Sequence, residues 1–297
     1  MRANFSRYLS DKITELFLEN LKAPQEEEYL KFTTPKKSTK DEEIYDSIGN
    51  LSAAEEKTEG GSLHYEQLSQ MYQTTVINKT YDRGFYETWE AVEDDVEKVL
   101  GKVNTGGMII AMVEKRELEV AVVVDGVFTV TAADGVYYAS NSHPLDTDKT
   151  AALNDNLMDA SAITPTNIET GCNMFNDIKD YAGNHFKTRA RAILAHANEE
   201  TGLKSIFQSN LVSGELSNTK NTLPNLAIIV GTYISKTYWH LLDTMIPSFI
   251  FQRRKGLSPF EDQDTRDTLN YYWAMVERYR AAIINPGYGI ISNAYAG

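Results

Sequence analysis

The sequence predicts an α+β fold with a globular part and two projecting appendages. Three patterns lead to this fold class: helix-spaced apolar residues after residue 89, a half-apolar hairpin pattern before it, and alternating helical and strand-like runs after residue 165. The chain has 297 residues, of which 42% are hydrophobic and 24% are charged. This length and composition are those of a globular protein with a sizeable core.

The first 43 residues predict a helix followed by an extended arm. Apolar residues recur near helical spacing over residues 6–22, and Pro24 ends this pattern. Residues 24–43 are rich in charge and contain few apolar side chains, so we expect them to form no core. Such an arm needs a partner surface.

Residues 44–81 predict a long β-hairpin. Two half-apolar runs, 44–51 and 63–81, flank a polar connection that contains Gly60 and Gly61. The second run alternates and is rich in β-branched residues, which favours a strand. Because an isolated two-stranded hairpin is at best marginally stable in water, we expect this one to rest on another surface, such as that of a neighbouring subunit.

A long helix is expected within residues 89–128, where apolar residues recur near helical spacing. About 35 residues at about 1.5 Å each would span about 50 Å, whereas the mean globular helix has about 11 to 12 residues. Two features oppose this helix: the pair Gly106–Gly107, and the β-branched stretch 120–127, which alone is typical of a strand. Local propensity therefore does not decide at which residue the helix ends.

The second half of the chain alternates helical and strand-like runs. A helix, a short apolar run and a second helix are expected in turn over residues 165–185, 191–197 and 198–211. Buried strand-like runs follow at residues 226–242 and 247–253. Residues 270–284 fit a strand or a helix by period, and their aromatic richness favours a strand.

Charge and cysteine content exclude several classes of protein. The formal net charge is −13, from 42 acidic and 29 basic residues, which argues against site-specific DNA recognition. The single cysteine, Cys172, allows no intrachain disulfide and no cysteine-based zinc site. The first 21 residues have no continuous apolar stretch, so we expect neither a signal peptide nor a membrane span, and a soluble protein.

No motif for catalysis or for ligand binding emerges, and we expect no catalytic residue, no cofactor and no metal. The five histidines lie in different predicted elements, and the Walker, dinucleotide-binding and nucleophile-elbow patterns are absent. The best enzymatic candidate is the group Ser142, His143 and Asp146, which we interpret as turn residues because a triad requires convergence in space. The glycosylation pattern at Asn78 is attributed to chance.

Four segments in order resemble the major capsid (major head) proteins of tailed double-stranded DNA bacteriophages of the Hong Kong 97 type, especially the Mu-like branch. The segments are a hairpin strand entering an acidic helix start, the helix end VAVVVDGVF, the turn SNSHPL, and a strand–acidic loop–strand unit with a glycine-containing turn. They cover residues 81–100, 120–128, 140–145 and 249–289.

The resemblance implies a Hong Kong 97 type capsid fold in five segments. These are an N-terminal arm, an extended loop, a peripheral domain with its long spine helix, an axial domain, and the return strands of the peripheral domain, over residues 1–43, 44–88, 89–187, 188–258 and 259–297. It also implies that the spine helix continues through the β-branched stretch 120–127. No residues of a covalent crosslink are assigned.

The implied function is assembly of hexamers and pentamers into the icosahedral head that encloses the phage genome. The expected location is the virion capsid, assembled in the host bacterial cytoplasm. Expected partners are other copies of the chain, portal and scaffolding or decoration proteins, and packaged DNA through non-specific contacts, with no membrane. Two alternatives stay open: an encapsulin-like compartment with enzyme cargo, and a cytosolic α+β enzyme that uses His143.

Overall fold

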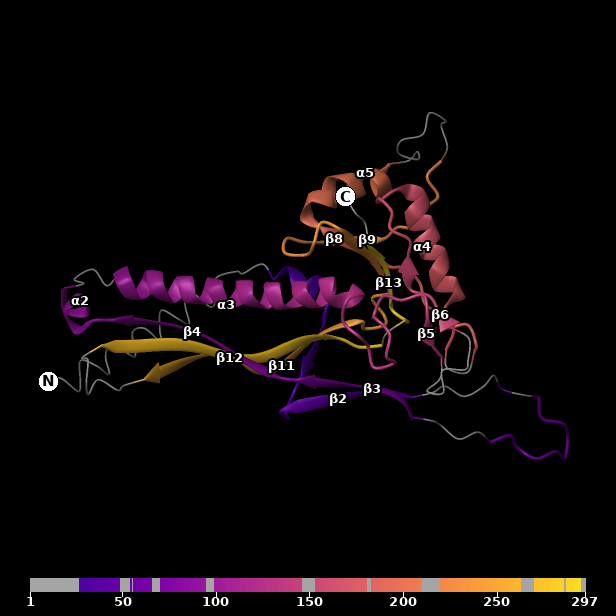
Figure 1. Cartoon of the computed structure of the whole chain (residues 1–297), viewed down its shortest axis with the longest axis horizontal. Helices are drawn as coiled ribbons and strands as arrows, with labels where there is room; N and C mark the ends of the chain where they lie inside the picture. The colour runs from indigo at the N-terminus through magenta and orange to yellow at the C-terminus, as the bar shows by residue number, and fades with distance from the viewer. Residues whose placement is uncertain are drawn as a thin grey trace.

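The computed structural model describes residues 27–48, 54, 56–65, 70–94, 99–145, 153–180, 183–209, 220–262, 270–285 and 287–294. The N-terminal helix expected over residues 6–22 lies outside these residues. Figure 1 shows a long helix on one sheet, a second sheet with two helices at one end, and a hairpin that extends beyond the body. The expected α+β class is confirmed.

A four-stranded sheet forms the elongated part of the molecule, in the order β1-β11-β12-β4. Its strands are β1 (Thr34–Lys37), β4 (Lys79–Glu87), β11 (Phe249–Asp262) and β12 (Tyr271–Ile283). The two longest strands, β11 and β12, pair antiparallel from Phe249↔Ile283 to Asp262↔Tyr272. The strand expected from the aromatic richness of residues 270–284 is therefore confirmed.

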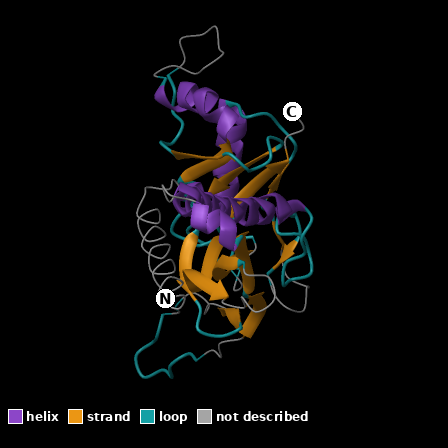
Figure 2. Ribbon diagram, turned by 90° about the vertical axis from the view of Figure 1, so that its left-hand side faces the viewer, coloured by secondary structure: helices purple, strands orange, loops and turns teal. Residues whose placement is uncertain are grey.

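The long helix α3 (Val99–Asp125) lies along one face of this sheet, after the short helix α2 (Trp89–Asp94) (Figures 1 and 2). At about 1.5 Å per residue its 27 residues span about 40 Å. Met108 and Met112 pack with Met275 of β12 in a buried cluster. Residues 95–98 lie outside the described residues, so the expected single helix is seen from residue 99 onwards.

The helix α3 continues through both features that opposed it. Gly106 and Gly107 lie within it, and a side chain at Gly107 would contact nothing within 4 Å. Val120 and Val124 are 2% and 0% exposed and belong to the main core, so tertiary packing overrides their strand propensity. The 3-10 turn η2 (Gly126–Phe128) ends the helix.

A five-stranded sheet, in the order β7-β13-β10-β8-β9, forms the other part. Its strands are β7 (Leu157–Met158), β8 (Ala192–His196), β9 (Ala227–Gly231), β10 (Tyr238–Leu242) and β13 (Ile290–Ala294). Helices α4 (Pro165–Asp177) and α5 (Glu200–Gln208), with the 3-10 turn η3 (Ala197–Glu199), follow the expected helix–strand–helix order.

The five-stranded sheet lies between two apolar clusters. Ile193 and Leu241 pack in one cluster with Phe175 of α4 and Leu203 of α5. On the other face, the main core joins Leu194 and other sheet residues to α3 and to the four-stranded sheet. One continuous core therefore connects the two sheets.

The expected hairpin is confirmed as β2 (Glu42–Ile48) paired antiparallel with β3 (Gln70–Ile77). A small bridge joins β5 (His143–Pro144) to β6 (Leu153–Asn154).

One expectation about the arm is wrong, namely that residues 24–43 form no core. Tyr29, in the 3-10 turn η1 (Glu28–Lys31), is 0% exposed and belongs to the main core, and β1 pairs with β11. Tyr29 reaches the core because the turn η1 places its ring against that of Phe251, with the ring centroids 4.6 Å apart.

Candidate assembly surface

The end of the hairpin projects from the body (Figure 1), and its exposed side chains include large apolar ones. Leu63 is 60% exposed and Tyr65 is 85% exposed. A turn closes this part, because the Gly61 amide donates to the Thr58 carbonyl over 3.0 Å, and Gly60 has a φ of 74° that suits glycine. Large apolar side chains on a projecting segment favour contact with another protein surface.

A chain of buried and partly buried side-chain hydrogen bonds lies where the hairpin leaves the body. The Tyr45 hydroxyl donates to Gln252 Oε1 over 2.8 Å, and Gln252 Nε2 donates to Asn78 Oδ1 over 3.0 Å. Asn78 Nδ2 then donates to Ser38 Oγ over 2.8 Å, and Ser38 Oγ donates to Glu43 Oε1 over 3.0 Å. Gln252 and Asn78 are 0% and 5% exposed. We name these five residues the hairpin lock.

The turn before β2 is held by a carboxylate. Glu43 Oε1 accepts the amides of Thr39 and Lys40 over 3.0 and 3.2 Å. These backbone hydrogen bonds, with that of the Ser38 hydroxyl, lower the pKa of Glu43. The turn thus keeps an ionised acceptor at the entry of the hairpin.

Residues 27–31 are tied to two other elements. The Tyr29 amide donates to Glu117 Oε2 on α3 over 3.2 Å, and burial raises the pKa of Glu117. Glu28 Oε2 accepts the Thr232 amide over 2.7 Å, in the connection after β9. The start of the described chain therefore contacts both α3 and the five-stranded sheet region.

A buried ion cluster lies between α3 and the four-stranded sheet. Arg116 Nε lies 2.8 Å from Glu277 Oε2, and Arg253 Nε lies 3.2 Å from Glu277 Oε1. Arg116 also pairs with Glu27. The Glu277 side chain is 0% exposed and that of Arg116 is 8% exposed. The facing carboxylates outweigh burial, which opposes the charged form, and raise the pKa of Arg116.

The residues of the enzymatic candidate are not assembled as a triad. His143 is 3% exposed, with Nδ1 at 2.6 Å from Asp134 Oδ2 and Nε2 at 3.1 Å from the Tyr138 carbonyl oxygen. The Ser142 hydroxyl lies 3.0 Å from Ser140 Oγ. Asp146 lies outside the described residues. Both ring nitrogens of His143 are thus engaged by groups that the candidate did not include.

The other residues noted in the sequence have structural surroundings. Asn78 of the glycosylation pattern is buried in the hairpin lock, and Cys172 is partly buried on α4, where burial raises its pKa to about 11. Within the described part of the chain, no group of three metal-ligating side chains occurs, and no helix is long and apolar enough to cross a membrane.

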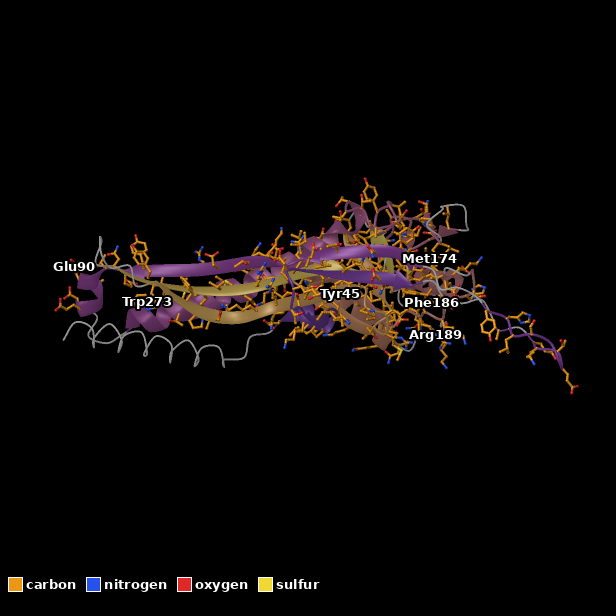
Figure 3. The ribbon with its side chains drawn as sticks, turned by 90° about the horizontal axis from the view of Figure 1, so that it is seen from below. Tyr45, Glu90, Met174, Phe186, Arg189 and Trp273 are labelled. Carbon is orange, nitrogen blue, oxygen red and sulfur yellow. The ribbon has the colours of Figure 1, made fainter. Side chains whose placement is uncertain are left out.

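Sequence reasoning missed Gln252 and Glu277. The one pattern that could have found them is a polar residue inside a buried strand, at the second-last position of the run 247–253 and in the middle of the run 270–284. Figure 3 places Tyr45, the partner of Gln252, near the middle of the long axis, and Glu90 and Trp273 at one end.

Comparisons with known proteins identify the fold. No family model matches the chain, and no curated protein matches it. A chain from the procapsid of bacteriophage JBD30 is 16% identical with a TM-score of 0.54, and the match covers 100% of this chain and 77% of that chain. The capsid of the cyanophage P-SCSP1u is 9% identical with a TM-score of 0.58, over 89% of this chain and 86% of that chain.

A virus-like particle from Pyrococcus furiosus also matches, with 12% identity and a TM-score of 0.54 over 95% of this chain and 98% of that chain. At these identities the likeness establishes the fold. The chain has the Hong Kong 97 type capsid fold, as the resemblance in the sequence implied. Membership of the Mu-like branch stays a prediction.

Proposed function

We propose that this chain is a major capsid protein, which self-assembles into hexamers and pentamers of the icosahedral head that encloses a tailed phage's double-stranded DNA. The observation that carries the proposal is the capsid fold, matched to the JBD30 procapsid chain over 100% of this chain. In this proposal the function is assembly of the shell, and the functional site is the set of surfaces through which copies of the chain contact one another.

The exposed surfaces support this proposal. The hairpin presents Leu63 and Tyr65 away from the core, and α3 exposes Ile110, Leu118 and Val122, which are 58%, 39% and 67% exposed. Residues four apart lie on one side of a helix, so Leu118 and Val122 are neighbours on its outer side. Stable interfaces between copies need about 800 Å² from each partner, and apolar side chains of this kind supply such contacts.

The segments take the roles that the resemblance implied. Residues 1–43 are proposed as the N-terminal arm, 44–88 as the extended loop, 89–187 and 259–297 as the peripheral domain, and 188–258 as the axial domain around capsomer centres. The location proposed is the virion capsid, after assembly in the host cytoplasm. Portal and scaffolding or decoration proteins are proposed as further partners.

The chain is proposed to have no catalytic role and to touch DNA only non-specifically. His143 supports the first point, because its ring joins Asp134 to the Tyr138 carbonyl and so holds the 134–143 loop. The net charge of −13 supports the second, since an acidic wall repels phosphates and lets packaged DNA slide.

The alternative with the same fold is a compartment with protein cargo. The observation that favours this alternative is the match to a virus-like particle from Pyrococcus furiosus. The contents of purified particles separate the two functions: nuclease-protected DNA supports the phage head, whereas a single co-purified enzyme supports the compartment.

The decisive experiment is expression of the chain followed by negative-stain electron microscopy. We expect closed particles, tubes or capsomer rings, whereas a stable monomer at high concentration would contradict the proposal. A matched variant replaces residues 56–65, which are exposed apart from the half-buried Gly61, by a short Gly-Ser turn. We expect this variant to fold with unchanged circular dichroism and to form no closed shell.

A further inference from the structure

The hairpin lock connects every segment from which the hairpin could pivot. Ser38 lies in the turn before β2, Tyr45 lies in β2, and Asn78 is the single residue between β3 and β4. Gln252 belongs to β11, in the four-stranded sheet. The entry of the hairpin, its exit and the sheet beneath it are therefore joined side chain to side chain.

The two amides of the lock are fully used. Asn78 Nδ2 also donates to the carbonyls of Lys40 and Asp41 over 3.0 and 3.1 Å. Gln252 Nε2 also donates to the Val76 carbonyl over 3.3 Å. Asn78 thus bonds to the turn before β2 and to β11, and Gln252 bonds from β11 to β2, β3 and Asn78. No apolar side chain of the same shape could replace these contacts.

Apolar contacts at the same place are few. The buried cluster beneath the hairpin consists of Val76, Ile250 and Ile284, with Tyr45 and Ala282 packed against it. Apolar contacts are non-directional, so a cluster of this size holds the hairpin on the sheet without fixing its angle. Hydrogen bonds require defined directions, and the lock supplies them.

We infer that Asn78 and Gln252 are positioning residues that set the angle at which the hairpin leaves the body, and so determine where its tip meets a second copy of the chain. This inference rests on the proposed function. His64 precedes Asn78 by 14 positions, and 14 steps of about 3.3 Å reach at most about 46 Å. A rotation of about 10° at Asn78 would then move the tip by up to about 8 Å.

The test uses Gln252→Leu, which removes both amide functions from the sheet side of the lock. Tyr45→Phe is a second variant. It keeps the ring in its apolar cluster and removes one hydrogen bond, so we expect it to fold. The matched control is Asn293→Ala, because Asn293 is a 0% exposed amide in β13 that bonds Asp159 and Ser161, in the other sheet.

Two measurements are made on each variant. The first is the distance distribution between spin labels at Gln73→Cys on β3 and Thr88→Cys after β4, both exposed positions, with Cys172 replaced by serine. The labelled chain is kept below its assembly concentration. The second is the size distribution of assembled particles by electron microscopy.

We expect Gln252→Leu to broaden the label distance by several Å and to give open or mixed-size particles, with a smaller effect in Tyr45→Phe. Asn293→Ala should lose comparable thermal stability and change neither measurement. Unchanged distances and particles in Gln252→Leu would overturn the inference. If the unaltered chain forms no particles, the proposed function fails, and the label distances still decide whether the lock fixes the hairpin.

Discussion

Replacement of Arg116 by methionine tests the buried ion cluster. In the folded chain, Arg116 Nε is 2.8 Å from Glu277, whose side chain is 0% exposed, and Arg116 also pairs with Glu27. Methionine fills most of the space, and among the described residues Arg253, whose side chain is 39% exposed, then remains as the ion-pair partner of Glu277. Removal of one partner from a buried pair typically costs about 3–5 kcal/mol, so we expect a loss of that size.

The double variant Arg116→Met with Glu277→Leu separates pairing from packing. It removes both buried charges, and replacement of a buried ion pair by apolar residues is often neutral or stabilising. We therefore expect the double variant to recover most of the loss. The assay is urea unfolding of the unassembled chain, followed by tryptophan fluorescence, to which the buried Trp239 and Trp273, 1% and 7% exposed, contribute. A loss below about 1 kcal/mol in Arg116→Met, or no recovery in the double variant, would refute this reasoning.

Three further outcomes are expected. A side chain at Gly171 would place Cβ 2.6 Å from Leu241 Cδ1, so Gly171→Val should destabilise the chain by about 1–3 kcal/mol in thermal unfolding, whereas Gly202→Ala, with open space around it, should gain up to about 1 kcal/mol. Thr164 accepts the Asn167 amide as the cap of α4, and Thr164→Ala should cost about 1 kcal/mol, with no cost meaning that the cap is dispensable. Burial lowers the pKa of His240 to about 3, while the unfolded chain takes up this proton near pH 6.5. Stability should therefore be retained above about pH 6.5 and lost at up to about 1.4 kcal/mol per unit as the pH falls towards 3, and His240→Gln should flatten this part of the profile in acid-titrated melts.

The sequence predicted elements whose patterns are local. The hairpin, the helix–strand–helix order after residue 165 and the strand at 270–284 each follow from the period of their own side chains. The continuation of α3 through Val120–Val124 did not, because the β-branched side chains there are held by packing in a core shared with distant strands. Resemblance to a family supplied what periodicity could not.

The buried polar groups were not predicted, because their partners lie far away in the sequence. Glu277 is 161 residues from Arg116, and Gln252 is 174 residues from Asn78. A charged or amide side chain alone in a strand indicates a solvent-facing position, and only the fold places its partner beside it. Tyr29 was missed for the same reason, since its apolar neighbours belong to β11 and not to the arm.

Neighbouring residues of one strand anchor both appendages. Gln252 and Arg253 are consecutive on β11, and consecutive side chains of a strand point to opposite faces. Gln252 therefore bonds to the hairpin on one face, while Arg253 pairs with Glu277 on the face of α3 and donates to the Tyr29 hydroxyl over 3.2 Å. The Arg253 carbonyl also accepts the Ser38 amide over 3.0 Å, which joins the arm to the hairpin entry. Because the arm and the hairpin share this short anchor on β11, a displacement of one shifts the attachment of the other. We therefore expect the effects of substitutions at Gln252 and Arg253 on the proposed assembly not to be additive.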